Sequence, residues 1–306
     1  MRKLAPVVLF VYNRVDHTAK TIEYLKKNSL AKYTNLYIYS DAAKSIGQEE
    51  SVKNVRELIY NIDGFKSISI IEANENNGLA KSVINGVSEV IDKHGKVIVL
   101  EDDIITSSQF LEFMNDSLDF YEDIERIWSI SGYNFPIEIP SQYKKSIYYA
   151  YRSSSWAWAT WKNRWDTIDW EIQSYKHYRL NPIKIYKFCK GGNDLDKMLR
   201  YQMKGKIDSW AIRWCFNQFI QNRYTVYPVK SFATNIGTDG SGTHCDSTSS
   251  RFNSKIYDNV NYTFTSSIDC DKTILRNFKR CVDRSLKRKI KKIFYKIIEG
   301  EYNGNK

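Results

Sequence analysis

The stretch KVIVLEDD, residues 96–103, places three acidic residues directly after an apolar run that is typical of a buried β-strand. Glu101, Asp102 and Asp103 repel one another, and burial of an unpaired carboxylate is strongly unfavourable. We therefore expect a positive charge beside them. Two interpretations are open: a divalent cation held by one or two carboxylates, or a solvated strand end near the positive terminus of a helix that begins near 106–108.

The residues before this stretch alternate between strand-like and helix-like patterns. Strands are predicted at 5–12, 35–41 and 67–73, and helices at 16–28, 49–62 and 78–94. Asp16 is placed to cap the first helix. With 96–103 as the fourth strand, the alternation predicts an α/β fold with a mostly parallel, Rossmann-like sheet and helices on both faces.

Polar residues follow each of the four predicted strands. They are Asn13 and Arg14, then Asp41, then Asn76 and Asn77, and finally Glu101 to Asp103. The carboxyl ends of parallel strands meet at one edge of a sheet, and ligands of such sheets bind beyond that edge. We therefore expect these side chains to converge on one crevice.

The positive charge of the chain is confined to one segment. The 306 residues carry a net charge of +11, but ten basic residues stand against Asp283 alone between Thr273 and Ile297. The rest of the chain is therefore nearly neutral. This confinement argues against a nucleic-acid-binding protein, in which basic residues would lie beside exposed aromatic residues along the binding surface.

Apolar residues recur at spacings of three and four through the same basic segment. They are Phe278, Val282, Leu286, Ile290, Ile293, Phe294 and Ile297. This pattern predicts a basic amphipathic helix over 273–298 that lies on an anionic membrane, joined to the body by a polar linker over 251–272. The alternative is a helix that docks on the body or on a partner subunit.

Cysteine usage and hydropathy indicate the compartment. The five cysteines are odd in number and form no CxxC pair, so they suggest neither a disulfide framework nor a zinc site. The N-terminal run PVVLFVY is too short for a signal peptide, and no other segment approaches a membrane span. We expect a cytoplasmic chain.

Five motifs stand in an order that resembles a known family. They are FVYNRVDHTAKTIEYLKKN at 10–28, NNGLAKSVINGV at 76–87, LEDDI at 100–104, ISGYNF at 130–135, and IDSWAIRWCFNQFIQN, YPVKSFATNIG and GTH between 207 and 244. Together they resemble bacterial nucleotide-sugar glycosyltransferases of the GT-A fold, similar to the alpha-mannoside beta-1,2-N-acetylglucosaminyltransferase that initiates complex N-glycans. The resemblance implies one GT-A domain, with 1–105 as its nucleotide-sugar-binding half and 106–250 as its acceptor-binding and catalytic half.

The resemblance implies a role for each acidic residue of the triplet as a variant DxD motif. Asp103 would ligate Mn²⁺ or Mg²⁺, which bridges the donor diphosphate. Asp102 would face the ribose, and Glu101 would support the pair. The metal would neutralise charge on the leaving nucleoside diphosphate, which supplies the positive charge that the triplet calls for.

Other donor contacts follow from the same resemblance. Arg14, with Asn13 beside it, would hold a phosphate, and Asp41 would accept a hydrogen bond from uracil unless it is a helix cap. Lys81 would reach the diphosphate unless it is a solvated helix lysine. Asn77 would shape the pocket, and His244, in a Gly-rich lid at 237–245, would touch the diphosphate or complete the metal shell unless it is a surface histidine.

The matching segment KIDSW nominates Asp208 as the general base of an inverting transfer. The family has two consecutive acids before its tryptophan, whereas Ser209 follows Asp208 here, and a helix N-cap is the alternative interpretation of Asp208. Competing acids are Asp194, Asp196 and Asp239. Of the many tryptophans we expect most in the core, with Trp156, Trp158 or Trp210 lining the acceptor side.

The implied activity is metal-dependent transfer of a sugar, from a UDP-sugar above all, to a hydroxyl of a glycan or lipid-linked acceptor. The implied setting is surface-polysaccharide synthesis at the inner face of the bacterial cytoplasmic membrane. A sugar nucleotidyltransferase is an alternative, but VYNRVDHT at 11–18 lacks the glycines of its phosphate loop. A nucleic-acid-binding protein is the other alternative.

Overall fold

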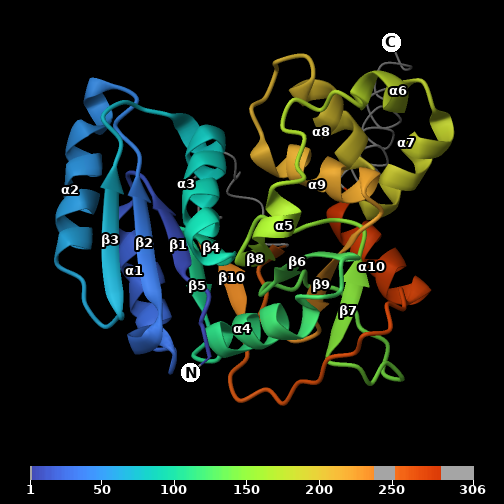
Figure 1. Ribbon diagram of the computed structural model, residues 1–306, viewed down its shortest axis with the longest axis horizontal. Coiled ribbons are helices and arrows are strands. Elements are labelled where there is room, and N and C mark those ends of the chain that lie inside the picture. The colour runs from blue at the N-terminus through green and yellow to red at the C-terminus, as the bar shows by residue number, and fades with distance from the viewer. Residues whose placement is uncertain (1, 238–251, 284–306) are drawn as a thin grey trace, which may run out of the picture.

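The computed structural model describes residues 2–237 and 252–283, and its centre is an eight-stranded sheet (Figure 1). The strand order is β3-β2-β1-β4-β8-β6-β9-β7. The strands are β1 (Val7–Val11), β2 (Asn35–Ser40), β3 (Ser67–Glu72), β4 (Lys96–Glu101), β6 (Ile127–Ser131), β7 (Ile147–Ala150), β8 (Trp158–Trp161) and β9 (Tyr224–Pro228). The first four pair in parallel, whereas β8 runs antiparallel between β4 and β6. The predicted α/β class with a largely parallel first half is confirmed.

Helices cover both faces of the parallel half because β1 is apolar on both faces. Val7 and Leu9 pack in one cluster with residues of α1 (Val15–Lys26), α2 (Glu49–Tyr60) and α4 (Phe110–Tyr121). Val8 and Phe10 point the other way and pack against α3 (Gly78–His94). Two short 3₁₀ turns, Ala31–Tyr33 and Ile46–Gln48, complete this half.

The start of α1 differs from the sequence prediction. The helix begins at Val15, so Arg14 is the N-cap residue and no side chain there accepts a capping hydrogen bond. Asp16 lies inside the first turn, where its charge still complements the helix dipole. The prediction that Asp16 caps this helix is therefore wrong. The bounds of α3 match the predicted 78–94.

A second, two-stranded sheet links distant parts of the chain. Residues Ile104–Thr106 form β5, which pairs antiparallel with β10 (Ala233–Asn235). For this reason α4 starts at Phe110, later than the predicted 106–108, and β10 follows β9 as a separate strand. This small sheet lies directly after the acidic triplet.

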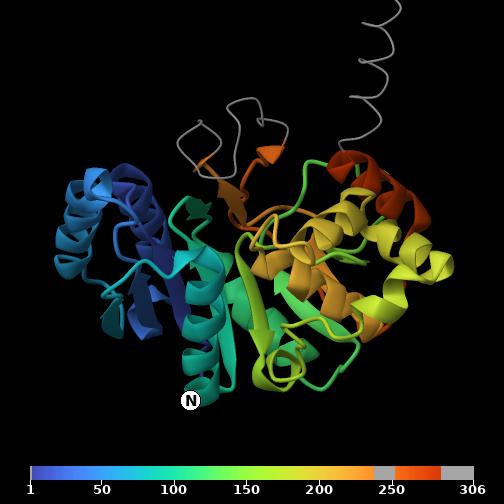
Figure 2. The same cartoon turned by 90° about the horizontal axis from the view of Figure 1, so that it is seen from above.

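The second half of the chain surrounds β6–β9 with short helices. Tryptophans of α5 (Lys162–Trp165) and α9 (Trp210–Ile220) pack with Trp158 against α3. Helices α6 (Tyr175–Arg179), α7 (Pro182–Phe188) and α8 (Asp194–Gln202), with a 3₁₀ turn at Cys189–Gly191, share a separate apolar cluster with α9. Figure 2 shows α1 and α2 at one end of the molecule and α6, α7 and α10 at the other.

The C-terminal segment packs on the body along most of its described length. Val260, Tyr262 and Phe264, in the predicted linker, lie against the main core. Helix α10 (Lys272–Val282) is capped by Asp271 and buries Phe278 against tyrosines of β7 and β9. The first part of the predicted 273–298 helix is thus docked on the body, and the part from 284 onward lies outside the described residues. No described helix is long and apolar enough to cross a membrane.

Candidate functional site

The register of the parallel strands aligns their carboxyl ends. Phe10 of β1 lies opposite Glu101 of β4, and Val11 lies opposite Ser40 of β2. Ser40 in turn lies opposite Glu72 of β3. The polar residues that follow these strands therefore start from one edge of the sheet, as the sequence predicted.

Arg14 is the positive partner of the acidic triplet. Its Nη2 donates hydrogen bonds to Oδ1 of Asp102 and to Oδ2 of Asp103, the second at 2.9 Å. Burial alone would lower the pKa of Arg14, but the two carboxylates raise it overall. Part of the charge that the sequence assigned to a metal is thus supplied by the protein.

One guanidinium does not balance three acids. Burial raises the pKa of Glu101 to about 8, and repulsion from Asp103 and Asp102 acts in the same direction. Burial also raises the pKa of Asp102 to about 6, although Arg14 opposes this shift. Both pKa shifts arise mainly from burial, with repulsion among the carboxylates added, so a further cation beside the triplet would stabilise the charged forms.

Two polar atoms of this cluster have no hydrogen-bond partner among the described residues. They are Oδ1 of Asp103 and Nη1 of Arg14, and both are buried. Buried polar atoms are rarely left unpaired in proteins, so such atoms point to a missing ligand. Within the described part of the chain, one acceptor and one donor of the same ion pair therefore lack a hydrogen-bond partner.

The donor set fits a divalent cation that is bound together with phosphate. A carboxylate oxygen is the ligand type that Mg²⁺ and Mn²⁺ prefer, and Mg²⁺ commonly takes one or two carboxylates plus substrate phosphates. Among residues 2–237 and 252–283 no group of three or more His, Cys, Asp or Glu side chains could hold a metal. A cation at Asp103 would therefore need oxygens from a ligand or water.

Residues 235–237 close over the ion pair. The Ile236 N–H donates to the carbonyl of Asp103 at 2.8 Å, and the Gly237 N–H donates to Oδ1 of Asn235 at 2.8 Å. A Cβ at Gly237 would lie 2.2 Å from Oδ2 of Asp103 and 2.8 Å from Nη1 of Arg14. Only glycine allows this close approach. The sequence predicts Gly237 as the start of a lid, but carries no signal for its contact with Asp103.

Helix α1 fixes the backbone on both sides of the ion pair. The hydroxyl of Thr21 is buried and donates to the carbonyl of Asp102 at 2.8 Å. The hydroxyl of Thr18 donates to the carbonyl of Arg14, also at 2.8 Å. Neither threonine can be recognised from the sequence, because only the fold brings α1 against the end of β4.

Asp41 caps helix α3 from the neighbouring strand end. Its Oδ1 accepts the Asn77 N–H and its Oδ2 accepts the Gly78 N–H, both at 2.9 Å. Oδ2 also accepts from the Asn76 side chain at 3.2 Å. These bonds satisfy a helix terminus, which is the alternative that the sequence left open. Recognition of uracil by Asp41 stays a prediction.

The remaining predicted donor contacts differ in placement. Asn13 is half-buried just after β1, and Asn77 is half-buried where it precedes α3. Lys81 is exposed in the first turn of α3. His244 lies outside the described residues, as does most of the predicted lid.

Asp208 stands before α9 with a side chain that is 71% exposed. Its Oδ1 pairs with Nη2 of Arg213 at 2.8 Å. The hydroxyl of Ser209 accepts the Ile212 N–H at 3.3 Å, so Ser209 and not Asp208 caps this helix. The cap interpretation of Asp208 is therefore wrong, and its role as a base stays a prediction.

Two of the competing acids are held by neighbours. Asp194 accepts three hydrogen bonds from the guanidinium of Arg152, at 2.8 to 3.0 Å. Asp196 accepts from the Tyr178 hydroxyl at 3.0 Å and pairs with Arg200 at 2.8 Å. Such pairing favours structural roles for both. The third competitor, Asp239, lies outside the described residues.

The tryptophans mostly fill the core, as predicted. Trp158 and Trp210 are 1% and 3% exposed and their rings lie 5.2 Å apart, so neither lines an open surface. The prediction that they line the acceptor side is wrong because tertiary packing buries them. Trp156 is half-buried between the rings of Tyr133 and Phe252.

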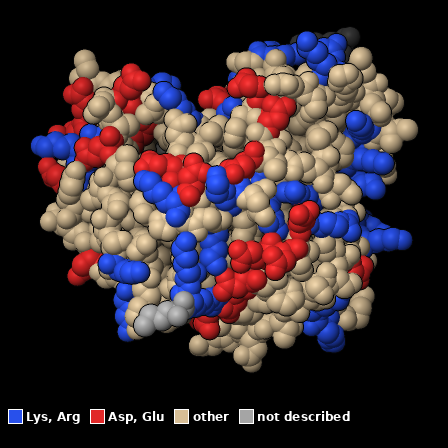
Figure 3. Space-filling view, in the orientation of Figure 1, with Lys and Arg blue, Asp and Glu red and all other residues tan. Residues whose placement is uncertain are grey.

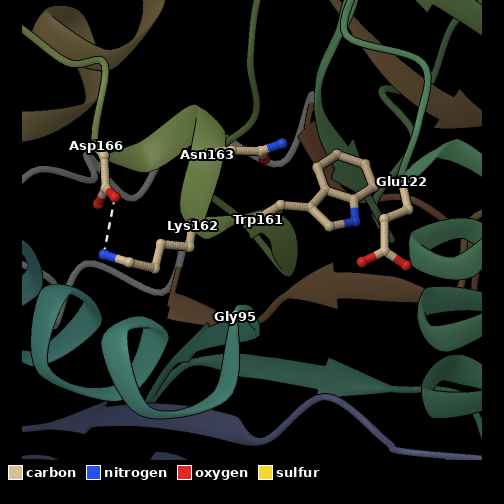
Figure 4. Close-up of a pocket in the computed structure, with 6 residues that line it drawn as sticks. All are labelled: Gly95, Glu122, Trp161, Lys162, Asn163 and Asp166. Atoms are coloured by element: carbon tan, nitrogen blue, oxygen red, sulfur yellow. Dashed lines mark ion pairs between the residues drawn. The ribbon is translucent and has the colours of Figure 1, made fainter.

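Two pockets lie at different ends of β4. One of about 340 Å³ is lined by Gly95, Lys162 and Asp166 among others, with Lys162 paired to Asp166 at 2.8 Å (Figure 4). Gly95 precedes β4, so the length of the strand, about 17 Å, separates this pocket from the acidic triplet. The other, of about 440 Å³, is lined by α1, by Ile105 and by Ile236, whose N–H donates to the carbonyl of Asp103.

Comparison with known proteins gives distant structural likenesses. No protein-family model and no curated protein sequence matches the chain. Mannosyltransferase PcManGT from Pyrobaculum calidifontis, in complex with GDP-Man and Mn²⁺, matches at 12% identity and a TM-score of 0.35, over 52% of this chain and 45% of that one. S. aureus TarS 1-349, in complex with UDP-GlcNAc, matches at 12% identity and a TM-score of 0.41, over 75% and 57%. The chain thus spans about half the length of these solved chains, and such likenesses establish no activity.

Proposed function

We propose that this protein is a metal-dependent glycosyltransferase that uses a nucleotide sugar, with a UDP-sugar as the first candidate. The observation that carries this proposal is the pair of unsatisfied buried atoms in the Arg14–Asp103 ion pair at the carboxyl ends of the parallel strands. A ligand that satisfies both must offer a cation and an anion together. A divalent cation on a diphosphate has this chemistry.

Each residue of the cluster has a task in this proposal. Oδ1 of Asp103 would ligate Mn²⁺ or Mg²⁺, and a bound cation would stabilise negative charge on the leaving diphosphate. Nη1 of Arg14 would donate to a phosphate oxygen while Nη2 keeps its bonds to the carboxylates. Asp102 would face the ribose, and Glu101 would support the pair.

Further contacts to the nucleotide sugar are proposed for residues outside the ion pair. Asn13, Asn77 and Lys81 start from the same sheet edge as the ion pair. Asp41 would have to recognise the base in addition to capping α3. His244 is proposed from sequence alone.

Asp208 is proposed as the general base that accepts the proton of the attacking hydroxyl. Its exposure keeps the carboxylate accessible to an acceptor, and Arg213 holds one oxygen in place. The second oxygen can accept the proton, with inversion at the anomeric carbon. A glycan or lipid-linked acceptor in surface-polysaccharide synthesis is proposed as the substrate.

Association with the inner face of the bacterial cytoplasmic membrane is proposed for the basic residues after Asp283. The apolar residues of α10 are used in docking on the body, so the earlier part of the predicted helix has its apolar face covered. The later part keeps seven basic residues between 284 and 297 in sequence. Such a segment is attracted to anionic lipid.

The test is release of nucleoside diphosphate from a panel of nucleotide sugars, with and without Mn²⁺. A transferase should release the diphosphate slowly even without an acceptor, and only with the metal. A sugar nucleotidyltransferase would instead form pyrophosphate from a nucleoside triphosphate and a sugar phosphate. The proposal fails if no nucleotide sugar binds or reacts in the presence of Mn²⁺.

A further inference from the structure

The hairpin of α6 and α7 presents three large apolar residues to solvent. Leu180, Ile183 and Tyr186 are 76%, 64% and 68% exposed. The other large apolar residues of the described chain that are more than half exposed are Tyr33, Ile46 and Tyr60, which are scattered through the first 60 residues. Single exposed apolar residues are ordinary, whereas three within seven residues form a patch.

The exposed side of α7 is a consequence of its local sequence. Asn181 caps the helix by accepting the Lys184 N–H at 3.0 Å, and Pro182 occupies its first turn. Phe188 is buried in the apolar cluster shared with α8 and α9. Ile183 and Tyr186 are three residues apart, so they share a different face of the helix that nothing in the described chain covers.

The sequence segment that carries this patch is basic and has no acidic residue of its own. Between Gln173 and Asn193 the chain has five lysines and arginines, all exposed, and no aspartate or glutamate. These residues are Lys176, Arg179, Lys184, Lys187 and Lys190. Figure 3 shows basic side chains along the edge of the molecule where Figure 1 places α6 and α7, whereas acidic and basic groups are mixed elsewhere on that face.

The end of α10 lies next to the same surface. Asp283 accepts hydrogen bonds from the backbone N–H of Asn193 at 2.5 Å and from its side chain at 2.7 Å. Asn193 is three residues from Lys190 in sequence. The last described residue of the chain, Asp283, thus lies close in space to the end of the hairpin segment.

We propose that the α6–α7 hairpin binds the surface of an anionic lipid bilayer, with Leu180, Ile183 and Tyr186 inserted among the headgroups. The aliphatic side chains match the apolar interior of a bilayer, and the tyrosine matches its interface with water. The basic residues of the same segment match the anionic headgroups. Charge complementarity selects this partner, since exposed apolar residues within a basic segment that has no acidic residue fit an extended anionic surface. The binding is independent of the glycosyltransferase proposal.

The test uses the full chain and two triple variants of matched exposure. One combines Leu180→Ser, Ile183→Ser and Tyr186→Ser, and the control combines Tyr33→Ser, Ile46→Ser and Tyr60→Ser. Cosedimentation with phosphatidylcholine vesicles, with and without phosphatidylglycerol, gives the affinity of each. We expect the hairpin variant to bind anionic vesicles at least about tenfold more weakly than the unmutated chain, and the control to bind as the unmutated chain does.

Hydrogen exchange provides a second readout that the basic segment after Asp283 does not obscure. Anionic vesicles should slow exchange in peptides that span 179–188, and neutral vesicles should not. Unchanged exchange there, or a hairpin variant that binds as tightly as the unmutated chain, overturns the assignment. So does a dimer in solution that the hairpin variant converts to a monomer while vesicle binding stays the same, because the patch would then join two copies.

Discussion

Replacement of Gly237 by alanine tests the geometry of the site with one methyl group. Gly237 has no positive φ, so alanine fits the backbone and the only penalty is steric. The added Cβ would lie 2.2 Å from Oδ2 of Asp103, whereas real contacts of this kind are longer than 3.0 Å. The carboxylate or the 235–237 backbone must therefore move by about 1 Å.

A shift of this size should affect activity more than folding. Overpacking of one methyl group costs about 1–3 kcal/mol of stability, whereas misplacement of a reacting group by about 1 Å costs about 10²-fold in rate. We expect Gly237→Ala to lower Mn²⁺-dependent release of nucleoside diphosphate by about 10²-fold. Thermal melting followed by circular dichroism should still show a folded protein.

Gly47→Ala is the matched control for this variant. Gly47 lies in a 3₁₀ turn after β2, and a Cβ there would meet no atom within 4 Å. Its activity and melting temperature should equal those of the unmutated chain. If Gly237→Ala keeps full activity with the same Mn²⁺ requirement, then Asp103 is not the metal ligand or residues 235–237 do not constrain it.

Three further variants separate the metal site, the base and the C-terminal helix. Asp103→Asn should abolish metal-dependent release while the melting curve keeps its cooperative form; retained Mn²⁺ dependence would contradict the assignment. Asp208→Asn should lower turnover by about 10²- to 10⁴-fold with nucleotide binding intact, and equal loss of both would move Asp208 out of the catalytic role. Phe278→Ala should lower the free energy of unfolding by about 3 kcal/mol, because Phe278 is 1% exposed among Tyr148 and Tyr227; an unchanged denaturant midpoint would show that α10 does not dock there.

The first half of the fold could be predicted because its local and tertiary signals agree. The apolar spacing of 78–94 predicts the bounds of α3. The alternation of strands and helices predicts that β1–β4 run parallel to one another. Parallel topology then places the polar residues after these strands at one edge without further information. The convergence of Arg14 with Asp102 and Asp103 followed from that rule alone.

The missed features depend on contacts between distant parts of the chain. Pairing of Ile104–Thr106 with Ala233–Asn235 has no local signal, since each run is three residues long. The contact of Gly237 with Asp103 follows from that pairing and was equally hidden. For α10, an apolar stripe flanked by lysines is compatible with a membrane or a protein partner, and only the tyrosines of β7 and β9 decide between them.

The atoms of the ion pair that lack a partner among the described residues favour a cation bound to a diphosphate over a cation or a phosphate alone. A cation alone would satisfy Oδ1 of Asp103 but leave Nη1 of Arg14 buried and unpaired. A phosphate alone would satisfy Arg14 but add negative charge beside Glu101 and Asp102, whose pKa values are already raised by burial and by mutual repulsion of the carboxylates. A cation bound to a diphosphate removes both penalties at once, so each component should favour the binding of the other. In the proposed complex, Nη2 of Arg14 would keep its bonds to the two carboxylates while Nη1 donates to the phosphate.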